Sequence, residues 1–545
     1  MIGEGWTGIC TAKEIADFGF EVVLVEDNAT LGQDPEFWIP SYLMDRQELK
    51  NEYEGINKHE LIEYLPERKL NGCTGTVGKF SVQLKGEKDT LDRTVGAIVL
   101  AHESRAVPLL ESYGLKDAQN AVSLFQLEMM LESYDSRGQG EGLLQNANQI
   151  AILYGFDQEG DILGQRRVME SVAKLEENGC DVYVYTRNLK VADKDLEELY
   201  KDNRNMGGIF FKLQEKPEIL SDNSISHYDP VLLRELNLKP DILVVEEELK
   251  PSPSSERLID ILGLTNPGDK FLQENNIHRL PVSTNRTGIY TVGTIRDIMS
   301  FSNIKADAAN VAVRLNSCFE HVNKQYATTK AFVDKDKCCY CLTCYRSCPH
   351  GAIRLEDKPV ISSFDCQVCG ICASECPQEA ITIVDVKWEE IKSAVSGVLK
   401  KSDKEYSPKI IAYCCENSAY EAGLAAKMFD RALPAGLEII KVPCAGSMNL
   451  DLILSGLKEG ADGILLLGCH PEACKSSKGN TFAYWRTWRL RKILEEVGFS
   501  GERIHFETLA ENMDFEFSKY AMEMEEALKN LGPNPLMQPV STSTT

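Results

Sequence analysis

The sequence predicts an α/β protein of several domains, with a small cysteine-rich domain between its α/β parts. Three observations predict it. A glycine turn at residues 3–8 opens an alternation of helices and short apolar strands that continues to about residue 330. Fourteen of the eighteen cysteines then fall between Cys338 and Cys474. From about residue 408 strands and helices alternate again, so the cysteine-rich segment separates two α/β regions.

Composition limits the functions that are compatible with the chain. It has 545 residues and a formal net charge of −24, which argues against a nucleic-acid or anionic-membrane surface, because both need clustered Lys and Arg. No apolar run approaches the roughly 20 residues of a membrane span. Residues 1–5 lack a basic region followed by an apolar stretch. We expect a cytoplasmic protein whose cysteines bind metal, and any membrane association to come through its partners.

The first α/β unit carries the pattern of a dinucleotide-binding fold. An amphipathic helix follows the glycine turn, and a short apolar strand over residues 21–25 ends at an acid. Such glycines let a pyrophosphate approach a helix N-terminus closely, and the acid accepts from a ribose hydroxyl. The residues expected to bind the cofactor are Gly3, Gly5, Gly8 and Glu26. An ordinary glycine turn is the alternative interpretation.

A second segment favours FAD over NAD in this unit. Residues 288–297 end a strand with Gly293 and Asp297, ahead of an expected helix over residues 306–315. In flavoproteins with two dinucleotide-binding units, such a turn closes over the flavin, so both residues are candidate FAD contacts. Only two residues precede the first glycine, so we expect the strand that normally enters the turn to be missing, either because the start is truncated or because another segment replaces it.

The second α/β unit lacks the features of an NAD(P) site. Its first strand, expected over residues 150–154, follows an expected loop over residues 134–148 and precedes Gly-Phe-Asp-Gln-Glu-Gly-Asp at residues 155–161. That turn has no Gly-x-Gly, and its three acids would repel a pyrophosphate. Direct oxidation of NAD(P)H is therefore not expected.

The cysteine-rich segment contains an internal duplication. The order Cys-x2-Cys-x2-Cys-x3-Cys-Pro begins at Cys338 and again at Cys366, with every ligand position shifted by 28 residues. In bacterial ferredoxins the fourth cysteine of each run binds the other cluster. The expected ligands are Cys338, Cys341, Cys344 and Cys376 for one [4Fe-4S] cluster, and Cys366, Cys369, Cys372 and Cys348 for the other. A structural zinc site is the alternative, but zinc does not require two crossed runs.

Cysteines in the C-terminal region each follow a predicted strand. Because parallel strands end at one edge of a sheet, these thiols can converge there and bind a [2Fe-2S] cluster. Five thiols, Cys414, Cys415, Cys444, Cys469 and Cys474, are available there, and the expected ligands are Cys415, Cys444, Cys469 and Cys474. Buried thiols without a ligand are the alternative interpretation.

Together these motifs resemble a known arrangement. Residues 1 to about 385 resemble the A-subunit family of heterodisulfide reductase, FAD proteins with ferredoxin-type clusters. Residues 408 to about 530 resemble the delta subunit of methyl-viologen-reducing hydrogenase through Cys414-Cys415, Val442-Pro443-Cys444 and Gly468-Cys469-His470-Pro471-x2-Cys474. The fusion is similar to the B-subunit of quinone-interacting membrane-bound oxidoreductases.

The chain departs from the family patterns at two places. Ser418 stands where the delta-subunit pattern has a further cysteine, and Ala101-His102-Glu103 stands where the flavoprotein family has Ala-Thr-Gly. The resemblance predicts these domains: 1–140 and 276–330, the two parts of an FAD-binding Rossmann-like domain; 141–275, a degenerate NAD-type domain; 331–387, a 2[4Fe-4S] ferredoxin domain; 408–532, a hydrogenase delta-subunit-like domain; and 533–545, a disordered tail.

The resemblance implies an oxidoreductase subunit of anaerobic metabolism that passes electrons between FAD, the clusters and partner subunits. Those partners would be heterodisulfide reductase-like, hydrogenase-like or quinone-interacting subunits, and substrate turnover would occur on them, since we find no Ser/His/Asp set and no catalytic residue. One alternative is a self-contained FAD/NAD(P) oxidoreductase of the glutamate-synthase small-subunit type. Another is a docking subunit without flavin whose clusters alone conduct.

Overall fold

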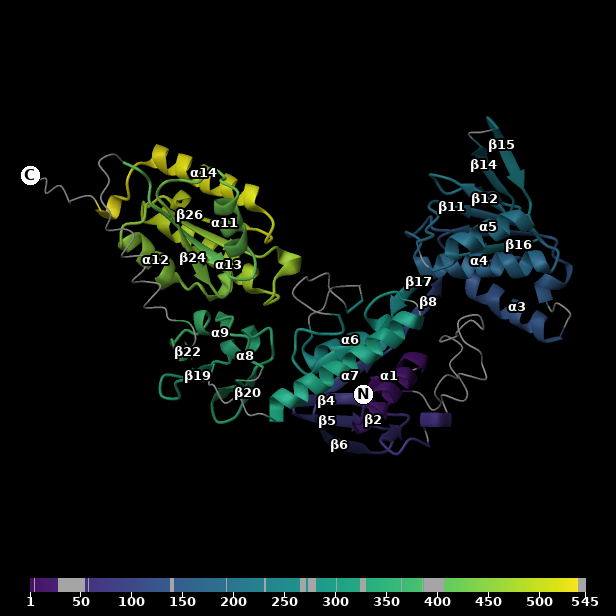
Figure 1. The fold of residues 1–545 in the computed structure, drawn as a ribbon, viewed down its shortest axis with the longest axis horizontal. Helices are drawn as coiled ribbons and strands as arrows, with labels where there is room; N and C mark the ends of the chain where they lie inside the picture. The colour runs from purple at the N-terminus through teal and green to yellow at the C-terminus, as the bar shows by residue number, and fades with distance from the viewer. Residues whose placement is uncertain are drawn as a thin grey trace, which may run out of the picture.

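The computed structural model of the chain describes residues 1–3, 5–27, 54–56, 58–137, 142–192, 194–229, 232–264, 271–272, 281–299, 301–323, 330–363, 365–384, 386 and 406–537. Within these ranges, no helix combines the length and apolar character needed to cross a bilayer. Of the expected disordered tail, residues 538–545 lie outside the described residues. Figure 1 shows the first α/β unit in the centre, the second at the right, and the ferredoxin and C-terminal domains at the left.

A five-stranded parallel sheet forms the centre of the first α/β unit, in the order β18-β7-β1-β2-β3. Its strands are β1 (Ile2–Gly3), β2 (Val22–Val25), β3 (Ile62–Leu65), β7 (Ile98–Ala101) and β18 (Ile289–Thr291). Helices α1 (Gly5–Asp17) and α7 (Phe301–Asn323) pack together in one apolar core. The expectation that the entering strand is absent was wrong, because Ile2 pairs with both Val25 and Leu100 and a two-residue central strand suffices.

A three-stranded antiparallel sheet covers the other side of this unit. It consists of β4 (Lys69–Thr76), β5 (Lys79–Lys85) and β6 (Thr90–Val95). The chain leaves through β8 (Ser104–Pro108) and returns through β17 (Glu247–Pro251), which pair antiparallel. Helix α6 (Pro253–Leu262) then packs in the same core as β4 and β5. Residues 253–262 therefore lie with the first unit, whereas the sequence pattern predicted them in the second.

The second α/β unit is a separate parallel sheet in the order β12-β11-β10-β16-β9. The strands of this sheet are β9 (Ala121–Ser123), β10 (Gln149–Tyr154), β11 (Asp181–Thr186), β12 (Ile209–Lys212) and β16 (Ile242–Val245). The helices are α3 (Leu124–Arg137), α4 (Ile162–Glu177), α5 (Leu196–Met206) and the 3₁₀ turn η2 (Gly142–Asn146). A small antiparallel sheet consists of β13 (Glu218–Ile219), β14 (Ile225–Asp229) and β15 (Arg234–Leu238).

Two sequence expectations about this unit differ from the structure. Residues 134–148 are not simply a loop, because α3 continues to Arg137 and η2 follows, with Leu131 and Leu144 buried in the core of the sheet. The unit also begins before residue 141, since β9 belongs to its sheet.

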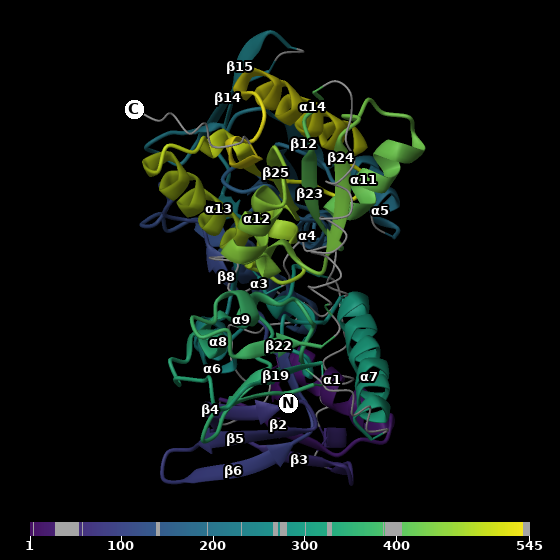
Figure 2. The ribbon, with the colours of Figure 1, turned by 90° about the vertical axis from the view of Figure 1, so that its left-hand side faces the viewer.

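The ferredoxin domain has two small antiparallel pairs and two short helices. Strand β19 (Ala331–Val333) pairs with β22 (Ile381–Ile383), and β20 (Ile353–Leu355) pairs with β21 (Pro359–Ile361). Helices α8 (Thr343–Ser347) and α9 (Ile371–Ser374) stand at equivalent places in the two halves. Figure 2 shows this domain between the first α/β unit and the C-terminal domain.

The C-terminal domain is a parallel sheet in the order β24-β23-β25-β26, with an apolar core on each face. Its strands are β23 (Ile410–Cys415), β24 (Leu437–Val442), β25 (Gly463–Gly468) and β26 (Ile504–Thr508); its helices are α11 (Ala419–Met428), α12 (Leu450–Lys458), α13 (Gly479–Glu496) and α14 (Asp514–Leu531); and its 3₁₀ turns are η4 (Ala445–Ser447), η5 (Pro471–Ala473), η6 (Gly501–Arg503) and η7 (Pro535–Met537). The three predicted strands of this domain are confirmed, although β23 continues through Cys415, and β26 was not predicted. The cysteines at or just after the ends of the predicted strands therefore lie at one edge of the sheet.

Candidate iron-sulfur and dinucleotide sites

The duplication in the ferredoxin domain extends to the backbone. Three pairs of positions separated by 28 residues adopt the left-handed conformation: Tyr340 and Val368, Leu342 and Gly370, and Gly351 and Glu379. The backbone N–H of Ala352 donates to Cys348 Sγ at 3.4 Å, and that of Ala380 donates to Cys376 Sγ at 3.3 Å. Both halves therefore turn the chain around a thiol in the same way.

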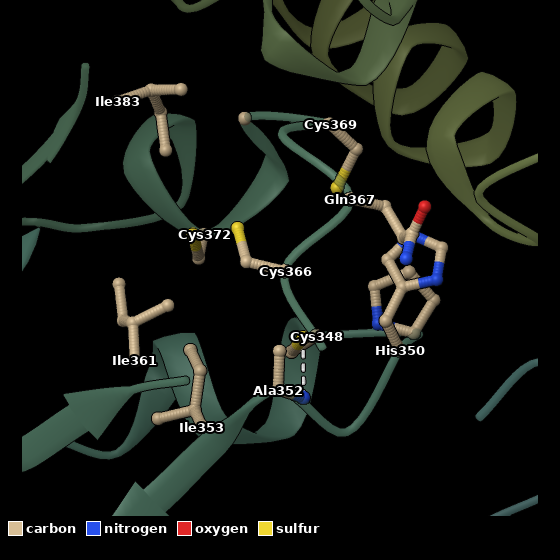
Figure 3. A pocket seen from close by; sticks show the side chains of 12 residues that line it. Cys348, His350, Ala352, Ile353, Ile361, Cys366, Gln367, Cys369, Cys372 and Ile383 are labelled. Atoms are coloured by element: carbon tan, nitrogen blue, oxygen red, sulfur yellow. Dashed lines mark hydrogen bonds between the residues drawn. The ribbon is translucent and has the colours of Figure 1, made fainter. Parts of the chain in front are cut away.

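The structure brings the eight repeat cysteines together in two crossed sets. Cys344 and Cys376, from the two halves of the repeat, pack in one cluster, and the charges of Cys376, Cys338 and Cys341 add to burial in raising the pKa of Cys344. A small cavity is lined by all four members of the second set, Cys348, Cys366, Cys369 and Cys372, together with apolar side chains such as those of Ile353 and Ile383. Figure 3 shows these sulfurs around the cavity. Cys339 is exposed and does not line that cavity.

Four buried thiols of the C-terminal domain form a ring. Cys415 Sγ lies 3.6 Å from Cys469 Sγ. Hydrogen bonds with Cys444 and Cys469 lower the pKa of Cys415, and hydrogen bonds with the same two thiols lower the pKa of Cys474. The same hydrogen bonds, followed by burial, raise the pKa of Cys444 and Cys469, so each of the four thiols has two others as neighbours.

The alternation of a β-strand separates the two adjacent cysteines of this domain. Cys414 points to the opposite face of the sheet, where it packs in an apolar core. Ser418 lies beside the ring and donates to Cys469 Sγ at 3.3 Å. In the part of the chain that the structure describes, no three His, Cys, Asp or Glu side chains have the arrangement of a single-ion site.

The ring is in contact with the ferredoxin domain. Ser476 lies two residues beyond Cys474. Burial raises the pKa of Cys369, and the side chain of Ser476 opposes that rise, so Ser476 stands beside this thiol. A Cβ built at Gly370 would lie 2.7 Å from Ser447 Cβ, so the missing side chain permits the close approach of α9 to η4. The loop that carries the ring residue Cys474 therefore lies beside a thiol of the second ferredoxin set, which no sequence pattern indicated.

An ion pair crosses the same interface. Arg486 of α13 lies 2.5 Å from Glu375 Oε1, beside Cys376, and also donates to the carbonyl of Met448. Both charged side chains are mostly buried, with 10% and 27% exposed. The interface between the two domains is therefore held by charge as well as by packing.

The glycines expected to bind FAD meet at one place in the first unit. A Cβ built at Gly3 would lie 3.0 Å from Gly8 Cα, which shows how tightly β1 packs on α1. Gly5 and Gly293 have φ values of +59° and +74°, and Gly293 contacts Thr7. The backbone thus has the shape that a dinucleotide-binding turn requires.

A carboxylate occupies the position where that turn would receive a diphosphate. Glu103 Oε1 accepts from the backbone N–H of Thr7 at 2.9 Å, and the carboxylate lies 2.6 to 2.7 Å from where a Cβ of Gly5 would stand. Because the side chain fills this space, the residues as placed do not fit a bound FAD diphosphate.

Glu26 and Asp297, the two acids expected to contact FAD, accept hydrogen bonds from other residues of the chain. Glu26 is buried, and its Oε2 accepts from the Tyr64 hydroxyl at 2.7 Å. Asp297 is exposed, and its Oδ1 accepts from the backbone N–H of Ile298 at 2.8 Å.

The turn of the second unit also surrounds a carboxylate. Glu246, at the end of β16, accepts from the backbone N–H groups of Gly155, Phe156 and Asp157 at 2.6, 3.2 and 3.2 Å. The Tyr113 hydroxyl donates to the same carboxylate at 2.7 Å. Burial raises the pKa of Glu246. The donors that would hold a phosphate in an NAD(P) site are therefore already used.

Comparisons with known proteins agree with this organisation. The family described as "Methyl-viologen-reducing hydrogenase, delta subunit" matches residues 410–532, and the family described as "4Fe-4S binding domain" matches residues 331–354. The iron-sulfur D-subunit of the F420-non-reducing hydrogenase of Archaeoglobus profundus is 30% identical over 24% of this chain and 95% of its own length.

A second relative covers most of the chain. The A-subunit of the ferredoxin:CoB-CoM heterodisulfide reductase of Methanosarcina mazei is 24% identical over 83% of this chain, which spans 59% of that relative's length. Among solved structures, the thioredoxin reductase of Lactococcus lactis covers 59% of the chain, with 98% of its own length, at 17% identity and a TM-score of 0.39. On the sequence matches, the chain is a homologue of the heterodisulfide reductase A-subunit, and its C-terminal domain belongs to the delta-subunit family of methyl-viologen-reducing hydrogenase.

Proposed function

We propose that this chain is an electron-transfer subunit of a heterodisulfide reductase-like redox complex, which carries three iron-sulfur clusters in a row. The observation that carries the proposal is the packing of α9, which contains Cys372, against η4, which begins directly after Cys444; there the Ser374 hydroxyl donates to the Ser447 carbonyl. Clusters bound at these thiols supply one-electron transfer over a wide range of potentials.

The cysteines divide into three sets of four. One [4Fe-4S] cluster is assigned to Cys338, Cys341, Cys344 and Cys376, a second to Cys366, Cys369, Cys372 and Cys348, and a [2Fe-2S] cluster to Cys415, Cys444, Cys469 and Cys474. The crossed sets support the first two assignments. The closed ring of four buried thiols supports the third, although Ser418 replaces a further cysteine of the family pattern.

Contacts between the chain's own residues support one order of the three sites. The crossed ligands Cys348 and Cys376 join the two ferredoxin sites, and the packing of α9 against η4 brings the second of these sites next to the ring. Arg486 and Glu375 hold the two domains together beside these thiols. The ferredoxin-domain site bound by Cys369 therefore lies between the other two.

FAD in the first α/β unit remains a prediction, with Gly3, Gly5, Gly8, Glu26, Gly293 and Asp297 as its proposed contacts. The proposed electron transfer does not depend on it, because the thiol sets and their contacts lie outside that unit. This arrangement also accommodates the docking subunit without flavin. The self-contained FAD/NAD(P) oxidoreductase is disfavoured, because Glu246 uses the donors of the second turn.

Helix α13 supplies a surface for a redox partner. The helix begins at Gly479, where there is no room for a Cβ next to Cys444 Sγ. One to two turns further on it exposes Tyr484, Trp485 and Trp488, beside the exposed Arg489 and Lys492. Aromatic and Arg side chains dominate interface hot spots. We assign this face to an acidic surface of another redox protein, by charge complementarity.

The experiment that tests the function is electron paramagnetic resonance of the anaerobically reconstituted full chain, with reduced methyl viologen as the electron donor. All three clusters are expected to accept electrons. The signal of the C-terminal cluster should be broadened by magnetic coupling to the neighbouring ferredoxin-domain cluster. A C-terminal signal without coupling, or ferredoxin-domain clusters that the donor does not reduce, would rule the proposal out.

A further inference from the structure

The position of Glu103 is set by the residues on both sides of it. The backbone N–H of Ile295 donates to the His102 carbonyl at 3.1 Å. The backbone N–H of Ser104 donates to Thr294 Oγ1 at 2.7 Å. Glu103 is therefore held between β7 and η3 (Gly293–Ile295), the two segments that border the glycine turn.

The carboxylate lies where the physics of the fold favours an anion. Helix α1 is 13 residues long, and its first N–H groups have no partner within the helix. The macrodipole adds a partial positive charge at this end, so a diphosphate or a carboxylate is stabilised there. Glu103 Oε1 accepts from Thr7 N–H at 2.9 Å and so uses one of these donors.

The conformation of Gly5 makes this approach possible. Gly5 has a φ of +59°, and the Glu103 carboxylate lies 2.6 to 2.7 Å from its missing Cβ. In dinucleotide folds, glycine at this place lets the backbone approach the pyrophosphate. In this chain the same space is filled by a side chain of the chain itself.

The second α/β unit repeats the arrangement. Strand β16 is the neighbour of β10 as β7 is the neighbour of β1, and an acid that follows each strand closely reaches into the adjacent turn. Glu246 is bound by three backbone N–H groups and by Tyr113. Both nucleotide-type turns of the chain thus hold a carboxylate.

We propose that Glu103 is a built-in competitor for the diphosphate of FAD, so that the first α/β unit binds FAD only when this carboxylate leaves the N-terminus of α1. The carboxylate and the diphosphate are both anions that need the same N–H donors and the same space. This inference goes beyond the proposed electron transfer and does not depend on it.

The test measures FAD binding by equilibrium dialysis of the full, reconstituted chain. Glu103→Gly is expected to lower the dissociation constant for FAD at least tenfold relative to the unchanged chain, since it removes both the charge and the obstruction. Glu103→Gln keeps the shape without the charge and should give an intermediate value. Glu87→Gly, which removes an exposed carboxylate from the same unit, is the matched control and should change nothing.

Equal FAD affinity of the unchanged chain and Glu103→Gly would overturn the proposal, as would an unchanged chain that keeps one FAD through gel filtration. Absence of binding by both proteins would also overturn it, because Glu103 would not be the obstacle. If Glu103→Gly does not fold, the FAD dissociation constant of Glu103→Gln is compared with that of the unchanged chain. A lower value for the variant supports the proposal, and an equal value overturns it. Iron content is measured on every sample, so that loss of clusters is distinguished from an effect on flavin binding.

Discussion

The side chain of Ser476 lies beside Cys369 and opposes the rise that burial causes in the pKa of this thiol, although the two residues belong to different domains. Hydrogen bonds to ligand sulfurs stabilise the more negative, reduced state and so raise a cluster's potential. Ser476→Ala is therefore expected to lower the midpoint potential of the cluster bound by Cys369.

The loss of one hydrogen bond of about 1 kcal/mol corresponds to a decrease of about 40 mV for one electron. The measurement is a redox titration followed by electron paramagnetic resonance. Ser455→Ala, which removes a hydroxyl that bonds to Leu452 within α12, is the control. An unchanged potential in Ser476→Ala would argue that the hydroxyl does not reach the cluster ligand.

The ion pair between Arg486 and Glu375 holds the C-terminal and ferredoxin domains together. Arg486→Ala leaves a mostly buried carboxylate without this partner, and we expect the interface to lose about 2 kcal/mol. The magnetic coupling between the clusters on the two sides should weaken while iron content stays the same. Arg489→Ala, an exposed cation on the same helix, is the control. Full coupling in Arg486→Ala would show that packing alone fixes the interface.

The hydroxyl of Ser418 lies 3.3 Å from Cys469 Sγ. Ser418→Ala should lower the midpoint potential of the C-terminal cluster by about 40 mV without loss of iron, because one hydrogen bond to a ligand is removed. Redox titration of that cluster's signal checks this. If Ser418→Ala instead loses the cluster, Ser418 is a ligand rather than a hydrogen-bond donor.

Glu246 accepts four hydrogen bonds in the interior of the second unit. In Glu246→Gln the amide NH₂ faces N–H donors, so the unit should lose about 2 kcal/mol of stability. Differential scanning calorimetry measures this, with Glu248→Gln of the partly exposed β17 surface as control.

NADH should reduce neither flavin nor clusters in the unchanged chain. Bleaching by NADH would contradict the interpretation of this turn.

Much of the site could be predicted from the sequence, because the spacing of the cysteines indicates which of them lie together. The 28-residue shift indicated both ferredoxin sets, since a ligand run and the turns around it are local features. The ring thiols could be inferred because each follows a strand of one parallel sheet, and Cys414 is separated from them by strand alternation.

Other features depend on contacts between residues far apart in sequence. Glu375 and Arg486 are 111 residues apart, and no local pattern indicates that they meet. The role of Ser476 depends on how two domains pack. The membership of β9 in the second sheet could not be inferred from three residues, and the two-residue β1 was missed because its neighbours, not its length, stabilise it.

The central claim is that three clusters are bound by three sets of four cysteines, and iron counting with Mössbauer spectroscopy on the anaerobically reconstituted full chain tests it most directly. We predict about ten irons per chain, two of them in a [2Fe-2S] environment. Cys415→Ser should lose those two irons, and Cys414→Ser, next to it on the opposite face of the strand, should keep them. About eight irons in the unchanged chain, or equal iron in both variants, would contradict the account.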